Sequence, residues 1–163
     1  MTVPVLELRR VSRIHGSDTN QVHALVDVDL AVGAGELLAV MGPSGSGKST
    51  LLNLAGGLDS PTSGEILVSG ESLGGLNRAE LARLRRRRVG YVFQSLNLLP
   101  SLTALENVML PRELDGVPTR RARREADAVL DELGLLNLGN RFPDDMSGGQ
   151  QQRVAIARAI VGD

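Results

Sequence analysis

The residues best suited to chemistry lie in the stretch GPSGSGKST, residues 42–50. It fits the pattern G-x-x-x-x-G-K-[ST], with the second fixed glycine at Gly47, followed by Lys48 and Ser49. In such a loop successive N–H groups point at a phosphate, the lysine reaches the β- and γ-phosphates, and the hydroxyl binds Mg²⁺. The pattern predicts binding of a nucleoside triphosphate, and the alternative is a glycine-rich turn with a surface lysine. The predicted phosphate-binding residues are Gly42, Pro43, Ser44, Gly45, Ser46, Gly47, Lys48, Ser49 and Thr50.

The sequence around this loop supplies elements that would hold it in place. The apolar run ELLAVM at residues 36–41 is typical of a buried strand. After the loop, Leu51, Leu52 and Leu54 precede a Gly-Gly pair that suits the end of a helix. The N-terminus of that helix would add its positive end to the phosphate site. A strand, a loop and a helix in this order favour the nucleotide site over the simple turn.

A second candidate phosphate site lies in MSGGQQQRVAIARAI, residues 146–160. Ser147, Gly148 and Gly149 open a predicted helix there. The apolar side of that helix is predicted to consist of Val154, Ala157, Ile160 and Val161. Backbone N–H groups at a helix N-terminus can hold a phosphate, although Ser-Gly-Gly by itself more often marks only a helix start. The phosphate loop in the same chain favours the phosphate-binding interpretation.

Four further segments are predicted to be strands. Residues 5–14 and 24–32 alternate loosely between apolar and polar residues, and we expect them to pair as an antiparallel flap. A short strand is expected at residues 65–70, after a cluster of turn residues. The segment VGYVFQ at residues 89–94 indicates another strand, with Gln94 at its end.

Three further helices are predicted between residue 76 and the Ser-Gly-Gly stretch. Residues 77–88 begin with an asparagine cap and a glutamate three positions on, which is a capping-box arrangement, and they end in arginines. A second helix is expected to start near Ser101 or Thr103. The clearest helix is residues 118–134, with proline in its first turn and a glycine suited to its C-terminus. Residues 95–145 therefore indicate a helical insert between α/β pieces.

The composition limits the classes of function. Of the 163 residues, 42% are hydrophobic and 23% are charged, as in a globular domain, and the net charge of −1 does not favour a polyanionic partner. Cysteine is absent, so no Cys-based zinc site is available, and no apolar run approaches the roughly 18 residues needed to span a membrane. Arginine runs at residues 85–88 and 120–124 could touch anionic lipid or nucleic acid, but solvated helix faces are the favoured interpretation.

The motifs, in this order, resemble the ATP-binding subunit of an ABC transporter across essentially the whole chain. GPSGSGKST resembles the Walker A loop, Gln94 the glutamine of the Q-loop, and SGGQQ at residues 147–151 the signature motif. Longer strings such as YVFQSLNLLPSLTALENV are similar to the branch of lipoprotein-release ATPases, macrolide-type exporters and the cell-division ATPase. The resemblance implies an α/β P-loop NTPase fold with an N-terminal antiparallel β flap. Residues 1–94 and 146–163 would be its core and residues 95–145 a helical subdomain.

The resemblance also implies roles for individual residues. Two copies would form a head-to-tail homodimer, in which each ATP lies between the phosphate loop of one copy and the signature residues of the other. The signature residues are Ser147, Gly148, Gly149 and Gln150. Gln94 would be catalytic, contacting the attacking water and, together with Ser49, the Mg²⁺ ion. His15 stands where a tyrosine usually stacks on adenine; a loop histidine without a role is an equally favoured reading.

The implied partner is a membrane permease subunit, contacted through residues 95–103, and no nucleic acid is expected. The implied location is cytoplasmic, peripheral on the inner face of the cell membrane. The alternatives are a soluble ABC-type ATPase acting on ribosomes or DNA, and a non-hydrolysing ATP-binding fragment. In the family the Walker B aspartate, the catalytic glutamate and the switch histidine follow the signature helix. We therefore expect the chain to be incomplete after Asp163, hydrolysis to be very slow or nil, and apolar surface to be open around Leu38 and Val92.

Overall fold

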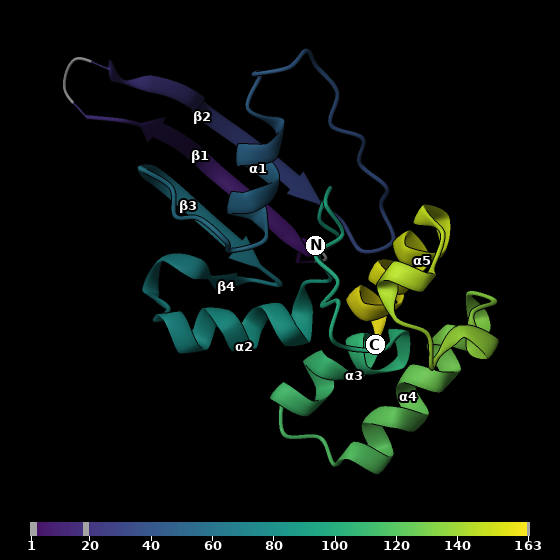
Figure 1. Ribbon diagram of the computed structural model, residues 1–163. Helices are drawn as coiled ribbons and strands as arrows, with labels where there is room; N and C mark the ends of the chain where they lie inside the picture. Colours follow the sequence, from purple (N-terminus) through teal and green to yellow (C-terminus); the bar gives the residue numbers. More distant parts are fainter. Residues whose placement is uncertain (1–2, 18–19, 163) are drawn as a thin grey trace. The chain divides into compact units, whose positions relative to one another are not determined.

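The computed structural model describes residues 3–17 and 20–162 (Figure 1). The chain divides into two compact units, Met1–Ala82 and Arg83–Asp163, each with its own elements. The division into a core of residues 1–94 and 146–163 and a helical subdomain of residues 95–145 stays a prediction. Among the helices of the described ranges, none is both long and apolar enough to cross a membrane.

The first unit contains a four-stranded antiparallel sheet in the order β2-β1-β3-β4 (Figure 1). Its strands are β1 (Leu6–His15), β2 (Val22–Val32), β3 (Ser63–Val68) and β4 (Glu71–Ser72). The pairing of β1 with β2 confirms the predicted antiparallel flap, and its register sets His15 opposite Val22. The end of this two-stranded arm therefore carries the histidine that the sequence singles out.

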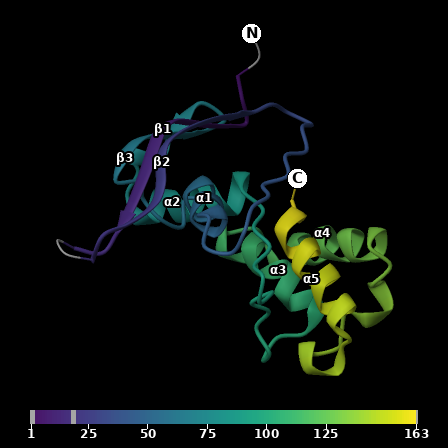
Figure 2. The same cartoon turned by 90° about the horizontal axis from the view of Figure 1, so that it is seen from above.

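One side of the sheet forms the core of this unit. Leu8 and Val11 are both buried although an odd spacing normally turns two strand residues to opposite faces. The register shifts between them, where Arg10 has a φ of +45°, and this irregularity lets both side chains face the core. Helix α1 (Lys48–Ala55) packs against β1, β2 and β3 and buries Leu54 completely (Figure 2). The sheet thus supports the helix that follows the phosphate loop.

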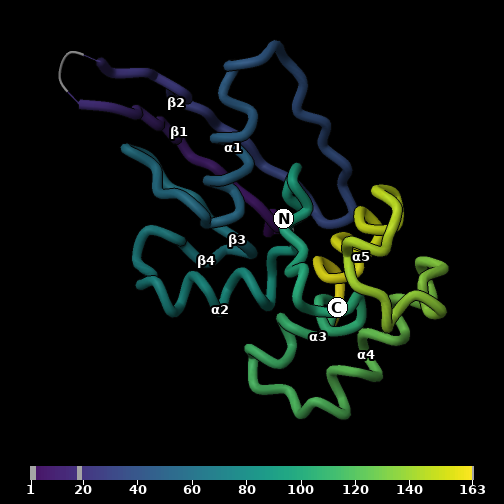
Figure 3. Tube along the Cα trace, viewed as in Figure 1, coloured from purple at the N-terminus to yellow at the C-terminus, as the bar shows by residue number. Residues whose placement is uncertain are grey.

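Two segments predicted to be strands, one of them a buried strand, are not strands. Residues 36–41 and 89–94, whose paths can be followed in the Cα trace of Figure 3, make no ladder with any strand of the described sheet. Leu37 is 95% exposed, and Leu38 and Val92 are 43% and 41% exposed. A buried parallel strand needs paired neighbours and covered faces, and no described segment pairs with these two. The strand predictions are therefore wrong here, whereas the predicted open apolar surface at Leu38 and Val92 is confirmed.

Helices form most of the second unit. The helices after β4 are α2 (Arg78–Arg88), which spans the boundary between the units, α3 (Ala104–Leu114), α4 (Thr119–Glu132) and α5 (Gly148–Ile160). Short 3₁₀ turns lie at Leu73–Gly75, Leu136–Leu138 and Pro143–Asp145. Helices α3, α4 and α5 pack against one another (Figure 2). Their shared core includes Leu105, Val108, Met109, Ala122, Ala126, Leu130, Leu135, Met146, Val154 and Ala157.

Local sequence determines where these helices begin and end. Asn77 Oδ1 accepts a hydrogen bond from the Glu80 N–H at 3.1 Å, and Glu80 Oε2 accepts one from the Asn77 N–H at 2.8 Å. Thr103 and Glu106 form the same reciprocal pair at the start of α3. The Glu106 carboxylate accepts hydrogen bonds from the backbone N–H and the hydroxyl of Thr103, and these bonds hold the pKa of Glu106 below its usual value. Gly134, with a φ of +69°, follows the C-cap of α4. The predicted capping residues are therefore confirmed.

Asn107 is a fully buried polar side chain that fastens the loop before α3. Its Oδ1 accepts from the Leu99 N–H at 2.8 Å, and its Nδ2 lies 3.1 Å from Leu99 O and 3.0 Å from both Leu102 O and Thr103 O. Asn107→Ala would leave buried backbone groups without partners, and we expect it to lower the free energy of unfolding of this unit by about 2 kcal/mol.

Urea unfolding followed by the fluorescence of Tyr91, the only tyrosine and a residue of this unit, measures the effect of Asn107→Ala. The matched control is Asn137→Ala, because Asn137 is exposed, and it should stay within about 0.5 kcal/mol of wild type. Equal unfolding midpoints for the two variants would contradict the role given to Asn107.

Candidate nucleotide site

The phosphate loop runs directly into helix α1. Gly47 is the N-cap of α1, with a φ of +85°, a left-handed conformation that glycine adopts without strain. Gly47 O accepts the first helical hydrogen bond from the Leu51 N–H at 2.8 Å, and the Ser46 N–H donates to Pro43 O at 3.3 Å. The loop therefore closes over the start of the helix, where free N–H groups and the positive end of the helix dipole favour an anion.

Lys48 folds back across this loop. Its Nζ donates to Gly42 O at 2.8 Å and to Pro43 O at 2.6 Å, and it lies 3.3 Å from Ser46 Oγ. All three partners belong to the loop itself, so the ammonium group is held over the phosphate loop by neutral oxygen atoms. Phosphate oxygens, which carry charge, accept stronger hydrogen bonds from an ammonium than carbonyls do. This arrangement can exchange its loop contacts for a bound phosphate.

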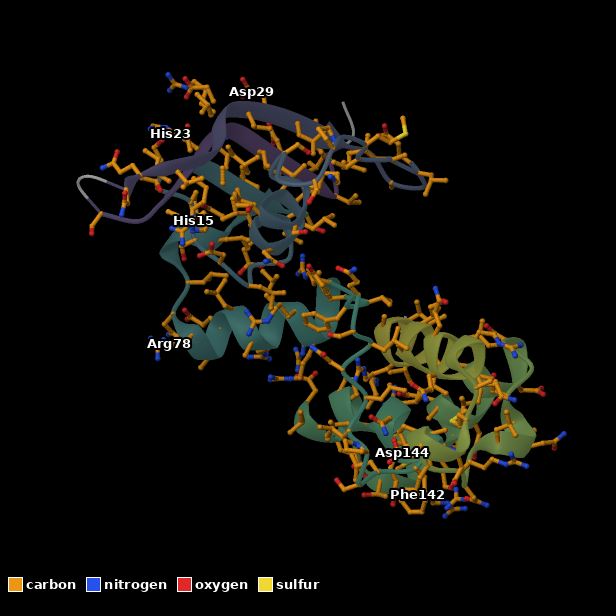
Figure 4. All side chains as sticks on the ribbon, turned by 45° about the horizontal axis from the view of Figure 1, so that its top comes forward. His15, His23, Asp29, Arg78, Phe142 and Asp144 are labelled. Atoms are coloured by element: carbon orange, nitrogen blue, oxygen red, sulfur yellow. The ribbon has the colours of Figure 1, made fainter. Side chains whose placement is uncertain are left out.

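A pocket of about 620 Å³ opens beside the loop, within the range of small-ligand sites. It is lined by residues 44–50 together with His15, Val22, His23 and Ala24 from the arm formed by β1 and β2. Figure 4 labels both histidines at the end of this arm. The fold thus brings the exposed His15 to the predicted phosphate loop. No local sequence pattern marks His23 as a site residue; strand pairing, which sets it opposite Ile14, brings it to the pocket.

The helix predicted after the Ser-Gly-Gly stretch is confirmed as α5. Ser147 caps it: Ser147 Oγ accepts from the Gln150 N–H at 3.4 Å, and Gln150 Oε1 accepts from the Ser147 N–H at 2.9 Å. Gly148 and Gly149 are exposed, with nothing within 4 Å of where a Cβ would stand. The apolar side is as predicted except at Ile160, which is 40% exposed. The N-terminus of α5 is therefore open to a ligand or to another molecule.

Gln94 lies in an exposed turn of the second unit. The two residues that follow this turn, Leu96 and Asn97, have φ values of +58° and +47°. The backbone carbonyls of both accept hydrogen bonds from the guanidinium of Arg158, on α5, at 2.6 Å each. Upstream of the turn, the rings of Tyr91 and Phe93 lie 4.5 Å apart. The turn that carries Gln94 is thus tied to the same helix that Ser147 caps.

The predicted site residues therefore fall into two sets. Residues 44–50 and His15 line one pocket of the first unit, whereas Gln94 and residues 147–150 belong to the second unit. That the two sets serve one nucleotide stays a prediction. Among the residues that the structure describes, no group of three or more His, Asp or Glu side chains could hold a metal by itself. The Ser49 hydroxyl suits Mg²⁺ held mainly by phosphates and water, as is usual for this ion.

The two arginine runs are partly engaged in ion pairs, so solvated helix faces describe them only in part. Arg87 Nε lies 2.6 Å from Asp115 Oδ2, and Arg121 Nε lies 2.7 Å from Glu125 Oε1. The hydrogen bond from Arg87 holds the pKa of Asp115 below its usual value. A lowered carboxylate pKa contributes stability at neutral pH that is lost as the pH falls through the folded-state pKa. These arginines therefore have a structural role within the second unit.

Comparisons with known proteins all find ATP-binding proteins of transporters. A family model described as ABC transporter matches residues 25–163. An uncharacterized ABC transporter ATP-binding protein of Thermotoga maritima is 48% identical over 159 residues, which are 98% of this chain and 68% of that protein. A pyoverdine export ATP-binding/permease protein of Pseudomonas fluorescens is 48% identical over 162 residues, or 99% of this chain and 25% of that protein. The chain thus spans about a quarter of the length of that exporter.

Two further comparisons agree. A macrolide export ATP-binding/permease protein of Hyphomonas neptunium is 46% identical over all of this chain and 25% of its own length. Among solved structures, an ATP-binding cassette captured as a dimer in a post-hydrolysis state with ADP and Pi matches with a TM-score of 0.88 and 42% identity. That match covers 96% of this chain and 69% of the cassette.

Proposed function

This chain belongs to the ABC transporter family, and we propose that it binds ATP and couples ATP binding and hydrolysis to the movement of a substrate by a membrane permease. The observation that carries the proposal is the phosphate loop of residues 42–50, with Lys48 held over it and a pocket beside it. The proposed location is the cytoplasmic face of the membrane, where a permease would meet the second unit.

Each residue of the pocket would contact a different part of the Mg²⁺–ATP complex. Lys48 would exchange Gly42 O and Pro43 O for oxygens of the β- and γ-phosphates, while loop N–H groups hold the same phosphates. The Ser49 hydroxyl would ligate Mg²⁺, which neutralises charge on the phosphates. His15, at the far wall of the pocket, would stack on the adenine. Each of these roles uses atoms that already face the pocket or the loop.

The open N-terminus of α5 would serve a second copy of the chain. In the proposed dimer Ser147, Gly148, Gly149 and Gln150 hold the γ-phosphate of the ATP bound to the partner's phosphate loop. The related cassette was solved as a dimer with ADP and Pi, which supports this arrangement. Gln94 would orient the attacking water, as the resemblance in sequence implies. Hydrolysis would therefore need both copies, whereas Mg²⁺-independent binding of the phosphates would need only the first unit.

The dimer proposal predicts different effects for two capping residues. Ser147→Ala removes a helix cap worth about 1 kcal/mol and also a proposed phosphate contact. We expect ATP affinity of the isolated chain to change less than about twofold, and ATP-dependent dimerisation, measured by analytical ultracentrifugation, to weaken at least about tenfold. The control is Thr103→Ala, which removes a capping box of the same type from α3. Equal loss of dimerisation in both variants would contradict the phosphate role of Ser147.

The most direct test of the proposed function is titration of the protein with Mg²⁺–ATP by calorimetry. Saturable binding with one site per chain is expected, and AMP, which lacks the β- and γ-phosphates, should bind more weakly if the phosphate loop contributes. Absence of any heat of binding at millimolar ATP would overturn the proposal. Copurification with a membrane permease, rather than with ribosomes or DNA, would then separate transport from the other roles of ABC-type ATPases.

A further inference from the structure

Arg158 makes an unusual pair of contacts with the segment that follows Gln94. Its Nη2 donates to Leu96 O and its Nη1 to Asn97 O, each at 2.6 Å. Two consecutive carbonyls can meet one guanidinium in this way because Leu96 and Asn97 both adopt left-handed φ values. Residues other than glycine rarely adopt that conformation, and two such residues in succession need support from their surroundings. The planar fork of arginine supplies that support, with two parallel donors in fixed geometry.

The same segment touches α5 at a second place, before Gln94. A Cβ on Gly90 would stand 2.3 Å from Ala159 O, so only glycine lets the backbone pass so close to the last turn of the helix. Within the turn, the Leu96 N–H donates to Phe93 O at 2.9 Å. Gln94 therefore lies between a close backbone contact at Ala159 and a pair of hydrogen bonds from Arg158, two adjacent residues of α5.

The surroundings of Arg158 make these contacts strong. The side chain is partly buried, and this burial lowers its pKa, although an arginine remains charged at any physiological pH. A partly buried guanidinium needs hydrogen-bond acceptors, and the two loop carbonyls provide them. Arg153, on the same helix, differs in each respect: it is exposed, and its Nη1 donates to Leu133 O at 3.2 Å. Arg158 is thus distinguished by its partners rather than by its residue type.

We propose that Arg158 is a positioning residue that fastens the Gln94 turn to α5, so that Gln94 and the signature residues at the other end of this helix move as one body. The inference deepens the proposed function and rests on it for the role of Gln94. Its physical basis is the 13-residue helix Gly148–Ile160, whose N-terminus is capped by Ser147 and whose last turn carries Arg158. A movement of α5 caused by phosphate binding at Ser147 would then also move the Gln94 turn, although Ser147 and Gln94 do not need to touch.

Hydrogen exchange of the nucleotide-free protein tests the fastening directly. In Arg158→Met, the amides of Leu96 and Asn97 should exchange at least about tenfold faster than in wild type, because two charge-assisted hydrogen bonds are lost. Arg158→Lys keeps the positive charge but loses the two parallel donors of the guanidinium, so its exchange rates should lie between those of wild type and Arg158→Met. This second variant keeps the test valid if Arg158→Met fails to fold. Arg153→Met is the matched control and should leave both amides unchanged. Unchanged exchange in Arg158→Met would overturn the proposal.

Nucleotide affinity provides a readout that a purely structural role would not move. Arg158→Met and Gln94→Ala should reduce the gain in ATP affinity that Mg²⁺ provides to the same level, and the double variant should reduce it no further. Affinity without Mg²⁺ should stay at the wild-type value in all three. A Mg²⁺-dependent gain that survives in Arg158→Met would overturn the positioning role. If the wild-type protein binds no ATP, the proposed function fails, and the exchange measurement alone still decides whether Arg158 fastens the turn.

Discussion

Replacing Lys48 with alanine is expected to weaken ATP binding about 100-fold. The ammonium now donates to Gly42 O and Pro43 O, and in the complex we expect it to donate to two phosphate oxygens instead. Two hydrogen bonds to charged groups, at about 1.5 kcal/mol each, amount to about 3 kcal/mol, which is roughly 100-fold in Kd. Calorimetric titration with Mg²⁺–ATP measures the change.

Two controls accompany this prediction. Lys48→Arg keeps the charge in a different shape and should lose less affinity than Lys48→Ala. The thermal midpoint of Lys48→Ala should remain within a few degrees of wild type, because Lys48 contacts only its own loop. Full ATP affinity in Lys48→Ala would show that the phosphate loop is not the nucleotide site.

Gly47→Ala is expected to reduce ATP affinity at least as strongly. The new Cβ would require a left-handed alanine at a φ of +85°, at a cost of about 1–2 kcal/mol. It would also stand 2.3 Å from Ala24 O, a backbone atom of β2 that cannot rotate away. The loop would therefore have to move off the arm of β1 and β2, which opens the pocket shared with His15. We expect a loss of at least about 100-fold in affinity, measured by the same titration.

Gly45→Ala is the matched control for this effect. Gly45 lies in the same loop with a φ of +80°, but nothing lies within 4 Å of where its Cβ would stand. The two variants therefore share the backbone strain and differ in the clash with Ala24 O. Gly45→Ala should lose about tenfold in affinity, as expected for the strain alone. Equal losses of ATP affinity in Gly47→Ala and Gly45→Ala would show that the clash with Ala24 O is not the cause of the larger effect.

Features encoded by neighbouring residues could be predicted from the sequence. The caps at Asn77, Thr103 and Ser147 and the antiparallel pairing of the first two strands all follow from patterns within a few residues. The strand predictions for residues 36–41 and 89–94 were wrong because they rested on local pattern alone. Apolar runs such as residues 36–41 indicate only that a segment can be buried, whereas burial itself depends on partners elsewhere in space.

The candidate site shows the same division. The glycine spacing of residues 42–50 predicts the loop, and its left-handed N-cap at Gly47 follows from the residue type. The contact between Arg158 and Leu96 joins residues 62 positions apart, and no local signal marks it. The burial of Asn107 could not be predicted either, because an asparagine between Glu106 and Val108 resembles a solvent-facing position of a helix. Polar contacts that depend on tertiary packing therefore leave no signal in the sequence.

The central claim is that ATP binds where Lys48 lies, and one property of the chain allows a direct test. Lys48 is the only lysine in the sequence, so an amine-reactive acylating reagent reports on a single side chain. Mass spectrometry of the peptide that contains Lys48 gives its rate of acylation. Saturating ATP should slow this rate at least about tenfold, whereas AMP, which lacks the β- and γ-phosphates, should protect little. An acylation rate that ATP leaves unchanged, or that AMP lowers equally, would contradict the account.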